Sequence, residues 1–151
     1  MDSLSFSYLP TALVVDVHEI DQQHANLFEQ LAALKSACVD HNAYMPLEAE
    51  ALFLSLVEHC ETEERLARAA GLDFLRHGEK HRAMLHSIRK RLDDMERPEA
   101  DVFGLIRYVE YWFERHITEE DKGLGESLRQ SAFLEVGQQV ADEFLEQGNH
   151  C

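Results

Sequence analysis

Cysteine is scarce in this sequence, and the few cysteines are not spaced to form a disulfide scaffold or a zinc ribbon. The chain of 151 residues has three of them, Cys38, Cys60 and Cys151. Their number is odd, and no pair shows the CxxC spacing of redox or zinc motifs. Free thiols persist in reducing compartments, so the sequence predicts a cytoplasmic protein.

Basic residues and long apolar runs are also lacking. The 14 Lys and Arg residues face 29 Asp and Glu residues, which gives a formal net charge of −15. Nucleic acids and anionic membranes attract basic surfaces, so we expect neither as a partner. No apolar run approaches the roughly 20 residues of a membrane span. The segment from Met1 to Pro10 lacks the basic start and the apolar stretch of a secretory signal.

Apolar and histidine side chains instead recur at steps of three and four in four segments of the chain. Such steps place side chains on one face of a helix, and a narrow stripe is typical of antiparallel bundles. The four stripes are Ile20, His24, Leu27, Leu31, Leu34 and Cys38; Leu52, Leu56, His59, Glu63, Leu66 and Ala70; His77, His81, Met84, Ile88, Leu92 and Met95; and Val102, Ile106, Val109, Phe113 and His116.

Helix-breaking residues separate these segments. Pro46 suits the start of a helix, Gly71 suits the end of one, and Pro98 suits a helix N-terminus. Gly123 and Gly125 are expected to end or loosen the fourth helix. Because short connections favour an up-down-up-down order, we predict an all-α protein, an antiparallel four-helix bundle in a single domain. Its parts are an N-terminal arm (1–17), the bundle (18–122) and an additional C-terminal helix (126–147), within the domain 1–151.

Five histidines and two carboxylates fall on the inward faces of the four helices. Histidine rarely fills a core, and a carboxylate is almost never buried without a partner. Two pairs are four residues apart, so both members of each pair can reach one centre. The last pair is five apart, so the helix must end or distort there, unless Glu120, at the better helical spacing, takes the place of Asp121. The seven candidate ligands are His24, His59, Glu63, His77, His81, His116 and Asp121.

This ligand set indicates a pair of metal ions. Imidazoles with carboxylates suit iron, manganese or zinc better than calcium or magnesium, which prefer oxygen ligands. A structural zinc needs only four ligands, typically including cysteine. Seven protein ligands therefore suit two metals, with bridging carboxylates and one open coordination position.

The spacing H…HxxxE…HxxxH…HxxxxD resembles that of the hemerythrin family, and most closely its bacterial members, the bacteriohemerythrins. The resemblance runs from about residue 16 to 123 and includes the segments IDQQH (20–24), HCETEE (59–64), HGEKH (77–81) and WFERHITEEDK (112–122). It implies a diiron centre with an oxo or hydroxo bridge. One iron would be held by His77, His81 and His116, and the other, with the open position, by His24 and His59. Glu63 and Asp121 would bridge them.

The resemblance implies reversible O2 binding for storage, delivery or sensing, without enzymatic turnover. Two alternatives stay open. One is an oxygen- or redox-sensing module that signals through its C-terminal helix to a partner or within a homodimer. The other is a diiron peroxidase or an enzyme that handles nitric oxide. Family members commonly carry Leu at the position of Phe113, and we expect this ring to restrict the O2 pocket. The apolar walls predicted for that pocket are Leu27, Leu56, Ile106, Val109 and Phe113.

Overall fold

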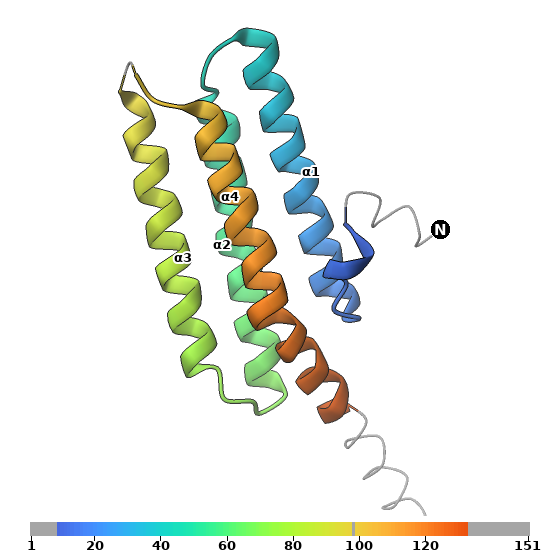
Figure 1. Ribbon diagram of the computed structural model, residues 1–151. Coiled ribbons are helices and arrows are strands. Elements are labelled where there is room, and N and C mark those ends of the chain that lie inside the picture. Colours follow the sequence, from blue (N-terminus) through green and yellow to red (C-terminus); the bar gives the residue numbers. More distant parts are fainter. Residues whose placement is uncertain (1–8, 98, 133–151) are drawn as a thin grey trace, which may run out of the picture.

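The computed structural model describes residues 9–97 and 99–132, and within these residues it contains helices and no β-strand. Four long helices dominate, as Figure 1 shows, so the prediction of an all-α protein is confirmed. A short 3-10 turn precedes α1, another follows α3, and a π-helical turn follows α4. The elements are η2 (Thr11–Leu13), α1 (His18–His41), α2 (Pro46–Ala69), α3 (Leu75–Asp93), η3 (Asp94–Glu96), α4 (Val102–His116) and η4 (Ile117–Asp121).

The four helices lie side by side. The loop between α1 and α2 and the loop between α3 and α4 lie at one end, and the loop between α2 and α3 lies at the other (Figure 1). Each helix contacts two neighbours most extensively: α1 contacts α2 and α4, and α3 contacts the same two helices. The inner face of every helix therefore meets the inner faces of its neighbours.

Local sequence explains where the helices begin and end. Pro46 is the first residue of α2, as predicted. Asn42 adopts the left-handed conformation (φ 48°) after α1, and Gly71 does so (φ 70°) after α2. The Asp101 side chain caps α4 by accepting a hydrogen bond from the backbone N–H of Gly104 at 2.9 Å.

The fourth helix does not end at its glycines. Residues 122–132 are helical and follow η4 without a break. The prediction that Gly123 and Gly125 end or loosen the fourth helix is therefore wrong. Gly125 serves packing instead, because a Cβ on it would lie 2.7 Å from the carbonyl oxygen of Val15. The predicted helix over 126–147 thus begins as a continuation of α4, and its residues 133–147 lie outside the described part of the chain.

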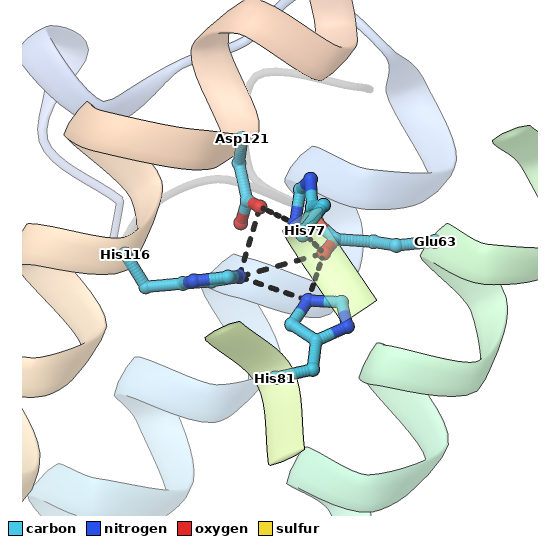
Figure 2. A group of neighbouring side chains, drawn as sticks. All are labelled: Glu63, His77, His81, His116 and Asp121. Carbon is cyan, nitrogen blue, oxygen red and sulfur yellow. Dashed lines mark hydrogen bonds and ion pairs between the residues drawn. The ribbon is translucent and has the colours of Figure 1, made fainter. Parts of the chain in front are cut away.

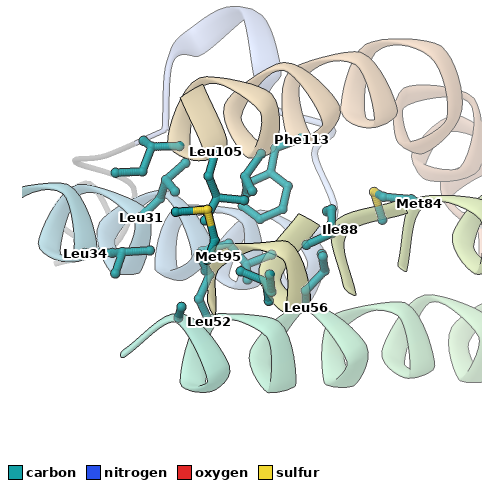
Figure 3. Close-up of a cluster of buried hydrophobic side chains, with 14 of the residues drawn as sticks. Leu31, Leu34, Leu52, Leu56, Met84, Ile88, Met95, Leu105 and Phe113 are labelled. Atoms are coloured by element: carbon teal, nitrogen blue, oxygen red, sulfur yellow. The ribbon is translucent and has the colours of Figure 1, made fainter. Parts of the chain in front are cut away.

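The predicted stripes form the core. Most of their apolar members pack in the middle of the bundle, as Figure 3 shows, and Leu31, Leu56 and Met84 are almost completely buried there. Ile20 is equally buried but belongs to a different cluster. A second cluster lies at the end of the bundle where α1 begins. There residues 9–17, here called the arm, pack on α1 and on the helix after η4. No described helix has both the length and the apolar character that a membrane span requires.

Buried polar contacts hold the arm in place. The Asp21 carboxylate, 3% exposed, accepts hydrogen bonds from the backbone N–H of Val15 (2.8 Å) and of Asp16 (3.0 Å). Asp16 has a positive φ of 62°, which turns the chain into this position. The Arg129 guanidinium donates a hydrogen bond to the carbonyl of Val15. The arm therefore links the start of α1 to residues 122–132.

Candidate metal centre

The seven predicted ligands converge inside the bundle, and five of them are drawn in Figure 2. α1 provides one histidine, α2 a histidine and a glutamate, α3 two histidines, and α4 with η4 the last histidine and the aspartate. The two carboxylates are completely buried, and the most exposed ligand, His77, has an 11% exposed side chain. The members are His24, His59, Glu63, His77, His81, His116 and Asp121.

Three histidines surround one oxygen of each carboxylate, and we call this the three-histidine half. The Nε2 atom of His81 lies 2.8 Å from Oε1 of Glu63. The Nε2 atoms of His116 and His77 lie 3.0 and 3.1 Å from Oδ1 of Asp121. The Nε2 atoms of His81 and His116 are themselves 3.0 Å apart. All five ligand atoms thus face one point.

Two histidines surround the other oxygens, and we call this the two-histidine half. The Nε2 atom of His24 lies 2.8 Å from Oδ2 of Asp121. The Nε2 atom of His59 lies 3.2 Å from Oε2 of Glu63. The two Nε2 atoms are 3.0 Å apart. Glu63 and Asp121 therefore each offer one oxygen to each half, which is how carboxylates bridge two metal ions.

The donor set fits metal ions. Each half places its ligand atoms within 4.8 Å of one another. Glu63 Oε2, Asp121 Oδ1 and His77 Nε2 are buried atoms without a hydrogen-bond partner, and buried polar atoms are normally satisfied. Two nitrogens bound to one metal at about 2.1 Å lie about 3.0 Å apart at right angles and about 3.4 Å apart at the tetrahedral angle. The observed 3.0 Å spacings are short enough for both nitrogens of each pair to bind one metal.

The π-helical turn brings Asp121 into the site. In a regular α-helix a residue five positions after His116 would lie roughly 140° around the axis from it. The π turn over Ile117–Asp121 accommodates one more residue per turn, so Asp121 returns to the inward face. The predicted distortion of the helix is confirmed, and Asp121, not the half-buried Glu120, joins the cluster.

The ligands perturb one another's proton affinity. Burial alone would lower the pKa of His59 and His116, but the Glu63 and Asp121 carboxylates outweigh it and raise these values to about 9 and about 10. Burial of the two carboxyls opposes their ionisation, yet the neighbouring imidazoles hold both pKa values well below the usual range. The carboxylates are therefore ionised and ready to bind a cation.

Three further side chains lie around the candidate ligands, and none of them was assigned a role from the sequence. The amide oxygen of Gln23 lies 2.7 Å from Nδ1 of His59, and the Gln23 amide nitrogen donates to the Thr62 hydroxyl at 2.9 Å. The Phe74 ring stacks on His77, with centroids 4.5 Å apart and planes 16° from parallel. Gln23 precedes a ligand in the IDQQH segment, but only the packing of α1 on α2 identifies its partner.

A small apolar cavity adjoins the two-histidine half. It offers about 10 Å³ to the centre of a water-sized guest, which is about the room that one such molecule needs. Three of the predicted walls are correct: Leu27, Leu56 and Phe113. Ile106 and Val109 are wrong, because they line a separate cavity deeper in the bundle core. Phe28, Met84 and Ile117 complete the wall, beside the rings of His24, His59 and His116.

Comparison of the chain with protein-family models, with curated proteins and with solved structures gives no match. Function is therefore inferred from the side chains and their geometry. These establish a buried cluster of histidines and carboxylates that can hold metal ions.

Proposed function

We propose that this protein binds two iron ions and, through them, binds O2 reversibly, in the manner of the bacteriohemerythrins that its motifs resemble. The observation that carries the proposal is that Glu63 and Asp121 each present one oxygen to the three-histidine half and the other oxygen to the two-histidine half. Two carboxylates placed in this way would bridge two metals side by side. Imidazole ligands suit iron as well as zinc, and zinc has no redox chemistry with which to bind O2.

The two halves differ in a way that favours ligand binding at one metal. The three-histidine half offers five protein ligand atoms and the two-histidine half four. With one shared oxo or hydroxo bridge, only the first half would fill an octahedral shell. The apolar cavity borders both histidines of the two-histidine half, His24 and His59, and one histidine of the other half, His116, so room for a small guest lies beside the expected open position. Two ferrous ions would supply the electrons that bound O2 withdraws and returns.

The surrounding side chains favour binding over oxidation. The cavity wall is made of apolar groups such as Leu27, Met84 and Phe113, which exclude the water that would protonate and release reduced oxygen. The cavity has about the room that one water-sized molecule needs, which suits a small ligand better than an organic substrate. Among the described residues, the cluster contains no carboxylate besides the two shared ones. A carrier therefore fits the site better than an oxygenase.

Anaerobic loading with Fe²⁺ followed by cycles of O2 and vacuum tests the proposal. We expect two irons per chain and a visible charge-transfer band that appears with O2 and disappears on its removal. The His81→Ala variant is the control for adventitious iron and should lose the band. One iron or fewer per wild-type chain, or no reversible band, would refute O2 carriage. Sustained turnover of peroxide or nitric oxide would favour the enzyme alternative.

A sensory role is the second candidate, and one contact favours it. Asp121 leads directly into residues 122–132, which hold the arm through Arg129. A change at the metals could therefore move this helix and alter its pairing with a partner or with a second copy of the chain. The test compares the oligomeric state and protease sensitivity of the deoxygenated and oxygenated forms. Identical behaviour of the two forms would leave the carrier role alone.

A further inference from the structure

The two histidines of the two-histidine half differ in the hydrogen bonds made by their outer ring nitrogens. In the two-histidine half, the outer nitrogen of His59, Nδ1, lies 2.7 Å from the amide oxygen of Gln23. The outer nitrogen of His24, also Nδ1, is buried and has no hydrogen-bond partner. Ligating histidines usually donate this outer N–H to an acceptor that fixes the tautomer and the ring orientation. In this half, only His59 has such an acceptor among the described residues.

The hydrogen bonds around Gln23 have one consistent direction. The Thr62 hydroxyl lies 3.1 Å from the backbone carbonyl of Glu58, to which it must donate. Its oxygen is then free to accept from the Gln23 amide nitrogen at 2.9 Å. This fixes the Gln23 amide with its oxygen toward His59, and that oxygen can only accept. The proton of neutral His59 therefore resides on Nδ1, and Nε2 keeps its lone pair for the metal.

We propose that Gln23, oriented by Thr62, is a positioning residue that holds the two-histidine half ready for its metal, so that loss of Gln23 selectively weakens metal binding in that half. The inference rests on the proposed function, because it assumes that each half holds a metal. The three-histidine half keeps its five ligand atoms without Gln23. Its metal should therefore remain.

The position of Gln23 explains why an apolar replacement is the sharper test. Gln23 lies in a surface groove between α1 and α2, together with Asn26, Gln30 and Glu58. A smaller side chain would let water enter from this groove and accept the His59 proton. Leucine removes the amide and fills most of its volume. Outer-shell changes of this kind typically weaken metal binding by roughly 10- to 100-fold.

The experiment is an anaerobic Fe²⁺ titration against a chromogenic chelator, which resolves the two binding steps. For Gln23→Leu we expect the second step to weaken about 10- to 100-fold while the first is unchanged. Thr62→Val should weaken the second step less than Gln23→Leu does. Thr62→Ser keeps the hydroxyl and should bind the second metal with the affinity of the wild type. Gln22→Leu is the matched control, because Gln22 donates only to exposed Asn26 on its own helix.

The outcomes separate this inference from the proposed function. Two steps in the wild type that both survive Gln23→Leu would overturn the inference and leave the dimetal centre intact. Equal weakening of both steps would also overturn it, because that is the result of general damage to the fold. Fewer than two steps in the wild type would refute the dimetal centre itself. Circular dichroism of each variant identifies any loss of helix.

Discussion

Deletion of Thr118 is predicted to preserve metal binding at the centre. Thr118 is exposed, and its hydroxyl contacts only the carbonyls of Glu114 and Arg115 on its own helix. Removing it makes Asp121 the fourth residue after His116, the same spacing that joins His59 to Glu63. The π turn then has no extra residue to accommodate, and a regular α-helix should replace it.

The magnitude follows from helix geometry. Four residues of α-helix turn through roughly 400°, so Asp121 would lie roughly 40° from His116 and would move along the axis by less than about 1.5 Å. Residues 122–132 shift together with Asp121 and keep their phase relative to it. We expect metal affinity within about tenfold of the wild type, which corresponds to about 1.4 kcal/mol.

Insertion of one alanine after Thr118 is the matched opposite change. It places Asp121 six residues after His116, roughly 120° away around an α-helix, and should abolish binding of both metals, the result that we also expect for Asp121→Ala. The assay is iron content after anaerobic loading and desalting, with circular dichroism to verify helix content. A deletion variant that loses iron as completely as the insertion variant would refute the reasoning, because the π turn would then be needed for its own geometry.

Three other changes have definite expected results. Phe113→Leu enlarges the cavity and removes the edge-on contact with Phe28 (centroids 5.8 Å apart), so O2 should dissociate faster in stopped-flow measurements at a cost of about 1–2 kcal/mol in unfolding free energy; an unchanged rate would exclude a gating role for the ring. Since the pKa values of His59 and His116 are raised to about 9 and about 10, both rings are protonated at pH 7 before metal binds, so metal uptake should release protons and weaken as pH falls. In the metal-free protein, these raised values contribute stability that is fully present below about pH 6.5 and lost as pH rises through 9 to 10, which denaturant titrations at pH 6 and pH 10 would detect as a lower midpoint at pH 10. Asp21→Ala removes the acceptor of one buried and one partly buried backbone N–H group and should lower the unfolding free energy by about 1–3 kcal/mol; a change below about 0.5 kcal/mol would mean that the arm contributes little to the fold.

The sequence predicted the members of the buried cluster well because helical periodicity is a local property. Six of the seven lie on stripes with steps of three and four, and these stripes form the inner faces. Asp121 was ambiguous, since periodicity alone favoured Glu120, and the π turn decides between them. Glycine at 123 and 125 suggested a helix end, but a close approach by Val15 explains Gly125. That contact joins residues over a hundred positions apart, which no local pattern records.

The cavity and the outer contacts were harder to predict for the same reason. Ile106 and Val109 share the stripe of Phe113, but they lie closer to the N-terminus of α4 and contact a different part of the core. Distance along the helix axis, which a stripe does not encode, separates the two cavities. The pairing of Gln23 with His59 depends on how α1 and α2 are aligned, and this alignment is a product of the whole core.

The attachment of the arm would couple arm binding to the state of the metal centre. Arg129 and Gly125 contact Val15 of the arm. Both lie on the helical segment that directly follows Asp121, a carboxylate of the candidate metal centre. If the metals shift this helix when they change state, they alter the affinity of the arm for its site. Reciprocity then requires that release of the arm alter the metals' preference between those states by the same factor. A molecule that captures residues 9–17 would therefore act as an effector of the centre without touching it.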